Sequence, residues 1–81
     1  MSSERIRALL GELNEELRTT GDLDEQTIEL LSRLNDDLDE IAPGSTAGDR
    51  AKELESRFAA THPVAERITR EIADILTKMG I

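Results

Sequence analysis

The sequence predicts a single all-α domain over residues 1–81. Leu, Ile and Ala recur with the 3.6-residue period of an amphipathic helix, and no stretch alternates with the two-residue period of a strand. The chain has no Cys, Trp or Tyr, so disulfide bonds are excluded and the core must be largely aliphatic. A chain of this length buries only about 60% of the surface that it exposes when unfolded. We therefore expect regular helix packing or self-association to supplement a marginal core.

The first predicted helix covers about residues 3–19. Its apolar positions are separated by steps of three and four residues, as on one face of a helix: Ile6, Leu9, Leu10, Leu13 and Leu17. Residues 19–22, which include a glycine, end this pattern.

The second predicted helix covers about residues 24–42 and begins at a defined cap. Asp24 is placed to accept hydrogen bonds from the first turn, and Leu23 and Ile28 occupy the two positions of a hydrophobic staple. The predicted core stripe is Ile28, Leu31, Leu34, Leu38 and Ile41. Residues 42–46 contain a Pro-Gly pair, which ends the helix and forms a loop.

The third predicted helix covers about residues 47–79 and carries a heptad repeat. One series of positions is Ala51, Phe58, Ala65, Ile72 and Met79, and the other is Ala47, Leu54, Thr61, Ile68 and Ile75. Together they form a coiled-coil seam over about four heptads. The seam keeps its phase across residues 61–63, so we expect one long helix that is kinked near Pro63.

A break at residues 61–63 is the alternative. Proline is favoured at the first position of a helix, so Pro63 is also suited to begin the second of two short antiparallel helices. At the chain end, Gly80 occupies the position of a C′ glycine, where Ile81 can contact Leu76 and close the last turn.

The expected architecture is an acidic helical hairpin packed on this long kinked helix. A straight helix of about 33 residues spans about 50 Å, whereas the two hairpin helices reach only about 25–28 Å. Part of the seam would stay uncovered, and a second copy of the chain would cover it in a symmetric dimer. The predicted self-association seam consists of Ala51, Leu54, Phe58, Ala65, Ile68, Ile72, Ile75 and Met79.

The C-terminal part of the chain resembles a known family. The His62-Pro63 step, the aliphatic helix after it and the closing Lys78-Met79-Gly80-Ile81 resemble the small bacterial family called domain of unknown function 4404. The resemblance is clearest over residues 57–81. It implies a bacterial, cytoplasmic, helical protein, and it carries no functional residues because the family has no assigned activity.

The charge of the chain is negative and unevenly distributed. The net charge is −8, and all of it lies in residues 1–41, because residues 42–81 have equal numbers of acids and bases. Such a surface repels nucleic acid and anionic lipid, so neither is an expected partner. The chain start lacks the apolar segment of a signal peptide, and no apolar run reaches the length of a membrane span. The expected compartment is the cytoplasm.

Candidate groups for chemistry are few. His62 is the one side chain that normally titrates near neutral pH, and no nucleophile with an orienting carboxylate accompanies it in the sequence. The acidic run Asp36, Asp37, Asp39 and Glu40 lies within a predicted helix, which spreads carboxylates around its axis rather than into a calcium cage. No phosphate-binding glycine loop or zinc signature occurs. The sequence therefore predicts no enzyme, no metal site and no cofactor.

Two functional interpretations follow from these observations. The first is a non-catalytic helical interaction or adaptor protein that forms a homodimer and binds another protein. The alternative is an acidic regulator that occupies a basic site on a partner, such as a nucleic-acid-binding protein. The two differ in the expected effect of salt, because only the second is held mainly by charge.

Overall fold

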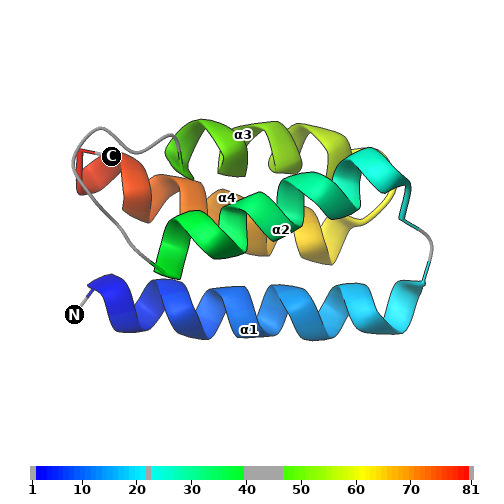
Figure 1. The fold of residues 1–81 in the computed structure, drawn as a ribbon, viewed down its shortest axis with the longest axis horizontal. Coiled ribbons are helices and arrows are strands. Elements are labelled where there is room, and N and C mark those ends of the chain that lie inside the picture. The colour runs from blue at the N-terminus through cyan, green and yellow to red at the C-terminus, as the bar shows by residue number, and fades with distance from the viewer. Residues whose placement is uncertain (1, 22, 40–46, 81) are drawn as a thin grey trace.

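The computed structural model describes residues 2–21, 23–39 and 47–80, and these ranges contain four α-helices and no strand (Figure 1). The helices are α1 (Ser2–Thr20), α2 (Glu25–Asp39), α3 (Ala47–Phe58) and α4 (Pro63–Lys78). The predicted all-α fold is confirmed. The molecule measures 33 × 21 × 19 Å, so its longest dimension is well short of the length of a continuous helix over residues 47–79.

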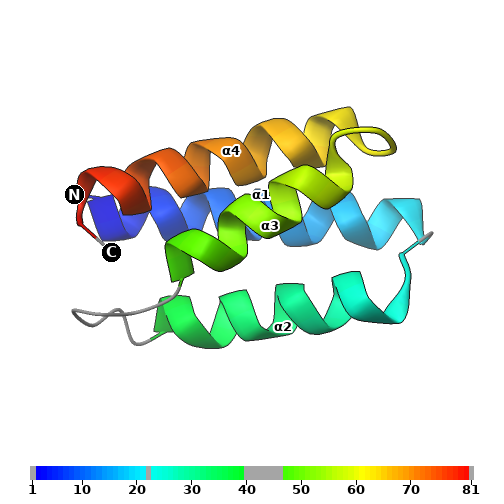
Figure 2. The same ribbon diagram turned by 90° about the horizontal axis from the view of Figure 1, so that it is seen from above.

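The two C-terminal helices form the centre of the bundle. α3 and α4 run antiparallel and pack closely against each other (Figure 2). α1 packs mainly against α4, and α2 packs mainly against α3. The first two helices are antiparallel, but they contact each other much less than they contact the central pair (Figure 1). Each is therefore held by a different helix of the central hairpin.

The helix is interrupted before Pro63: α3 ends at Phe58 and α4 begins at Pro63. The interpretation of one kinked helix over residues 47–79 is therefore wrong, and the alternative of two antiparallel helices is confirmed. Inside a continuous helix, Pro63 would lack a backbone donor and its ring would clash with the carbonyl of Ala59. As the first residue of α4 it needs no donor. The backbone N–H groups of Thr61 and His62 both donate to the Phe58 carbonyl, at 3.2 and 2.9 Å, and close the end of α3.

The ends of the helices follow the sequence signals closely. The Oδ1 atom of Asp24 accepts a hydrogen bond of 2.8 Å from the backbone N–H of Thr27, so Asp24 caps α2 as predicted. Gly21 and Gly80 follow α1 and α4 with φ angles of 61° and 79°. These angles lie in the left-handed region that glycine adopts at low cost, and they allow the chain to leave each helix.

Several predicted features lie outside the described residues. They are Asp22, the end of the second predicted helix at residues 40–42 with Ile41 in its core stripe, the loop at residues 42–46, and the contact of Ile81 with Leu76.

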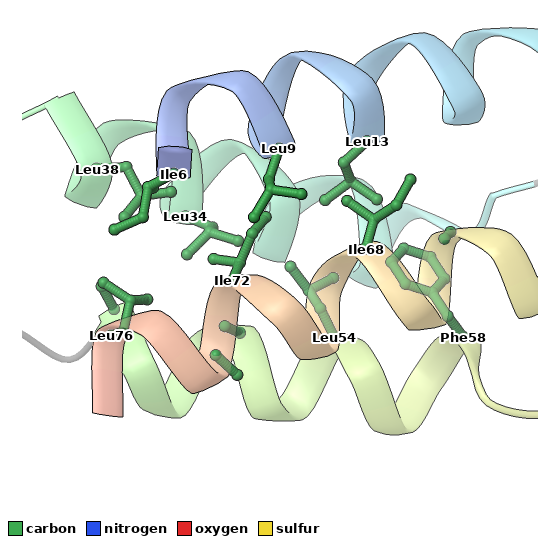
Figure 3. Close-up of a cluster of buried hydrophobic side chains, with 14 of the residues drawn as sticks. Ile6, Leu9, Leu13, Leu34, Leu38, Leu54, Phe58, Ile68, Ile72 and Leu76 are labelled. Atoms are coloured by element: carbon green, nitrogen blue, oxygen red, sulfur yellow. The ribbon is translucent and has the colours of Figure 1, made fainter. Parts of the chain in front are cut away.

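The core is aliphatic apart from one ring, that of Phe58. Leu9 and Leu13 of α1 point toward Ile72 and Ile68 of α4 (Figure 3), and Ile6 of α1 is fully buried. The remaining buried apolar side chains are Leu17, Leu34, Leu38, Ala47, Ala51, Leu54, Phe58, Ala65, Ala73 and Leu76. Helices from both halves of the sequence therefore share a single core.

One predicted core position is wrong. Ile28 is 51% exposed, whereas its neighbour Thr27 is buried. α2 packs mainly against one helix, so only a narrow face of it is covered, and that face contains Thr27, Leu34 and Leu38.

Candidate functional site

A cleft of about 370 Å³ opens at the end of the bundle where the α3–α4 turn approaches the start of α2. Its walls are the segment before α2, the α3–α4 turn, and one side each of α2 and α3. It is lined by Leu23, Asp24, Thr27, Arg57, Phe58, Thr61 and His62. This cleft contains the single histidine together with an acid and a base, so it has the composition in which a catalytic site would be sought.

The acid in this cleft, Asp24, is engaged as a helix cap. Hydrogen bonds from the side chain and the backbone of Thr27 lower the pKa of the Asp24 carboxyl group, and the positive charge of Arg57 acts in the same direction. Asp24 is therefore ionised at neutral pH. A carboxyl group held in this state is poorly suited to donate a proton.

The histidine is occupied by its own neighbours. The Nδ1 atom of His62 lies 2.8 Å from the Thr61 hydroxyl, and its ring stands edge-on to Phe58 with the ring centroids 5.7 Å apart. His62 is also the residue that precedes α4, and its carbonyl accepts a hydrogen bond from the backbone of Glu66. No carboxylate among the described residues makes a hydrogen bond to the imidazole. The ring thus serves to cover Phe58 and to shape the turn.

Arg57 is the positively charged residue in the cleft, and it links α3 to α2. Its Nη2 atom donates to the Oε1 atom of Gln26 at 3.4 Å, a long hydrogen bond. Its Nε atom is buried and has no hydrogen-bond partner among the described residues. The charged groups of this cleft therefore hold helices and turns together.

The predicted self-association seam lies inside one chain. Six of its residues are buried between the helices of a single copy: Ala51, Leu54, Phe58, Ala65, Ile68 and Ile72. Ile75 is partly buried against this core, and Met79 is 38% exposed. A second copy can use these side chains only if the α3–α4 hairpin opens. Any dimer of the closed chain would have to use its outer surface.

A second hollow surface, which we call the α1–α4 groove, runs between the two helices named. It has a volume of about 620 Å³ and is lined by Gly11, Glu12, Glu15, Glu16, Thr19, Val64, Arg67 and Ile68. Val64 is 43% exposed in it. The groove is wide and shallow, and acids dominate its α1 wall.

Two features of the sequence are related to this groove, although neither locates it. Gly11 interrupts an otherwise strong helix, and Glu12, Glu15 and Glu16 share one side of that helix. The groove could not be located without knowing that α1 packs on α4, where Arg5 and Glu71 form an ion pair of 3.2 Å.

The acidic run at the end of α2 does not converge on one point. Asp36 and Asp39 are exposed, Asp37 forms an ion pair of 2.6 Å with Arg50 of α3, and Glu40 lies outside the described residues. In the part of the chain that the structure describes, no group of three or more acidic, histidine or cysteine side chains is arranged to hold a metal ion. None of the described helices is long and apolar enough to cross a membrane.

Comparison with known proteins gives one match. Residues 6–81 match the model of the family described as Domain of unknown function (DUF4404), which covers nearly the whole chain. No curated protein and no solved structure matches the chain. The predicted resemblance, which is clearest in the sequence over residues 57–81, is therefore confirmed and extends through the four described helices.

Proposed function

The chain belongs to the family described as Domain of unknown function (DUF4404), and we propose that it is a non-catalytic helical module that acts by binding another protein. The roles of the polar groups in the end cleft support this proposal. Asp24 caps α2 and Arg57 bridges α3 to α2, while His62 bonds to Thr61 and covers Phe58. These groups have structural uses in the folded chain.

The observation that carries the proposal is the α1–α4 groove. An apolar side chain that is 43% exposed lies at Val64, beside charged groups that form no ion pair with any described residue, namely Glu12, Glu16 and Arg67. A hollow that combines an exposed apolar side chain with charged groups around it is an arrangement found where proteins bind one another. In the end cleft, by contrast, Asp24, Arg57 and His62 already have hydrogen-bond partners within the chain.

Affinity capture tests this function. The tagged chain is expressed in its native cell and purified at low and at high salt, and each captured protein is then titrated against the purified chain. We expect one partner that binds in a defined stoichiometry in the purified system. If no captured protein binds the purified chain, the proposal of an interaction module is wrong.

Self-association is a separate proposal within this function. Its seam is buried in a single closed chain, so a dimer would form through the outer surface or by opening of the α3–α4 hairpin and exchange of helices between two copies. Sedimentation across a range of concentrations tests it: a dimer supports self-association, and a monomer at every concentration contradicts it.

The acidic regulator is the second candidate function, and the α1 wall of the groove favours it. Glu12, Glu15 and Glu16 provide three negative charges along about one turn of α1. A partner held by these charges would dissociate as salt is raised, whereas a partner held mainly by apolar contacts would persist. The two salt conditions of the capture experiment therefore separate the candidates.

A further inference from the structure

We propose that the α1–α4 groove binds a basic amphipathic helix supplied by another protein. This inference rests on the proposed function and specifies the surface and the chemistry of the partner. Three features of the groove support it: a glycine with open space before it, a length that matches two turns of a helix, and an excess of acids over bases.

The first feature is Gly11, which lies in the middle of α1 and lines the groove. Glycine destabilises the interior of a helix because it loses more backbone freedom on folding than any other residue. Among the described residues no close approach requires glycine at this position, since a Cβ atom added to Gly11 would meet no atom within 4 Å. A glycine with open space before it permits the close approach of another backbone, as at other helix–helix contacts made through small residues.

The second feature is the length of the groove. The α1 residues that line it run from Gly11 to Thr19, which corresponds to about 12 Å along the helix axis. That length matches about two helical turns of a partner, over which apolar side chains recur at positions i, i+3, i+4 and i+7. On the facing wall of α4, Val64 is the exposed apolar contact, and Ile68, four residues further along, lines the groove but is itself mostly buried in the core.

The third feature is charge. Glu12, Glu15 and Glu16 outnumber Arg67 among the charged groups of the groove. Glu15 pairs only with Arg18, at 3.6 Å and in an exposed position, where an ion pair adds little stability. Lys or Arg side chains flanking the apolar stripe of a partner would find these carboxylates available.

A second copy of this chain is a poor occupant of the groove. Two copies that met groove to groove would bring the same three glutamates together, and each copy has a net charge of −8. Like charges placed opposite each other oppose association. The groove therefore fits a basic partner better than it fits a symmetric dimer.

Two synthetic helices serve as probes of this groove. Both carry the same stripe of Leu residues and a fluorescent label, but one has Lys and the other has Glu at its polar positions. Binding to the purified full chain is followed by fluorescence anisotropy at low and high salt. We expect the Lys helix to bind and to weaken as salt is raised, and the Glu helix to bind at least about tenfold more weakly. Equal binding of the two helices, or no binding of either, would overturn the proposal.

A pair of matched variants locates the binding surface. Gly11→Leu fills the groove where the chain has open space, and Ser32→Leu adds the same side chain to an exposed position of α2. We expect Gly11→Leu to weaken binding of the Lys helix at least about tenfold and Ser32→Leu to leave it unchanged. Circular dichroism of both variants verifies that the helices are intact. Equal affinities for the two variants would mean that the peptide binds elsewhere.

A second pair of variants tests the charges. Glu12→Lys combined with Glu16→Lys reverses the α1 wall, and Asp36→Lys combined with Glu53→Lys makes the same change in net charge on α2 and α3. We expect only the first pair to abolish binding of the Lys helix and to favour the Glu helix. Equal losses in both pairs would show that net charge alone attracts the probe, which contradicts a defined site.

The inference and the proposed function can fail separately. If a partner captured from the native cell binds Gly11→Leu as tightly as the parent chain, the groove is not its binding site, but the chain remains an interaction module. If no partner binds at all, the proposed function itself is wrong.

Discussion

Replacing Phe58 with Ala tests the core at the place where α3 ends and the turn to α4 begins. Phe58 is 1% exposed and has the largest of the fully buried side chains. Truncation of a buried Phe to Ala costs about 3–5 kcal/mol, because transfer free energy is lost and a cavity remains. At about 0.05–0.15 kcal/mol per residue, a chain of 81 residues has a total stability of about 4–12 kcal/mol. Phe58→Ala should therefore remove from about a quarter to all of the free energy of unfolding.

Urea unfolding followed by far-ultraviolet circular dichroism measures this loss. Phe58→Leu is the control, since it removes fewer buried atoms and should cost clearly less than Phe58→Ala. The His62 ring loses its edge-on contact in both variants, so the difference between them reports the volume of the cavity. A loss below about 1 kcal/mol in Phe58→Ala would refute the reasoning, because a side chain that contributes so little cannot be buried in the way described.

Three further predictions follow from the helix ends and from Gly11. Gly11→Ala should raise the free energy of unfolding by about 1 kcal/mol, measured by the same urea unfolding, because the new methyl group enters open space; a loss would mean that Gly11 is required by the fold. Asp24 has a lowered pKa, so its contribution is present above the ordinary carboxyl pKa near 4 and is lost as the pH falls through the folded value. Asp24→Ala should lower the thermal midpoint at neutral pH and flatten its fall in acid, and an unchanged acid dependence would contradict this assignment. Pro63→Ala should favour one continuous helix over α3 and α4 and shift the chain to a larger, domain-swapped assembly in size-exclusion chromatography. An unchanged elution volume would mean that the turn does not depend on Pro63.

Local signals in the sequence located most of the helix boundaries. The predicted first helix at residues 3–19 agrees with α1 to within one residue at each end. Asp24 caps α2, and Gly80 ends α4 with a left-handed φ. These features depend on a few neighbouring residues, so they are encoded where they occur. The all-α class was predictable because helical periodicity can also be recognised within short stretches of the sequence.

The position of each helix relative to its neighbours was not encoded locally. The exposure of Ile28 depends on how α2 lies on α3, and the α1–α4 groove exists only because α1 packs on α4. Periodicity indicates that a helix has a buried face, but it does not indicate which helix covers that face. The end cleft was missed for a similar reason, since Asp24 and His62 are far apart in the sequence.

The heptad repeat over residues 47–79 explains why the sequence favoured a long helix and why the structure has a hairpin. Phe58 and Ala65 are seven residues apart in either case, and both arrangements bury them, so the repeat alone does not distinguish the two. The energetics do. Closing the short turn at residues 59–62 restricts only a few residues, and loop closure costs little at this length. Covering an open seam with a second copy requires about 4–15 kcal/mol for lost translational and rotational freedom. Because α1 and α2 are long enough to cover both arms of the hairpin, the intramolecular arrangement is favoured, and Pro63 at the middle of the repeat marks where the chain turns.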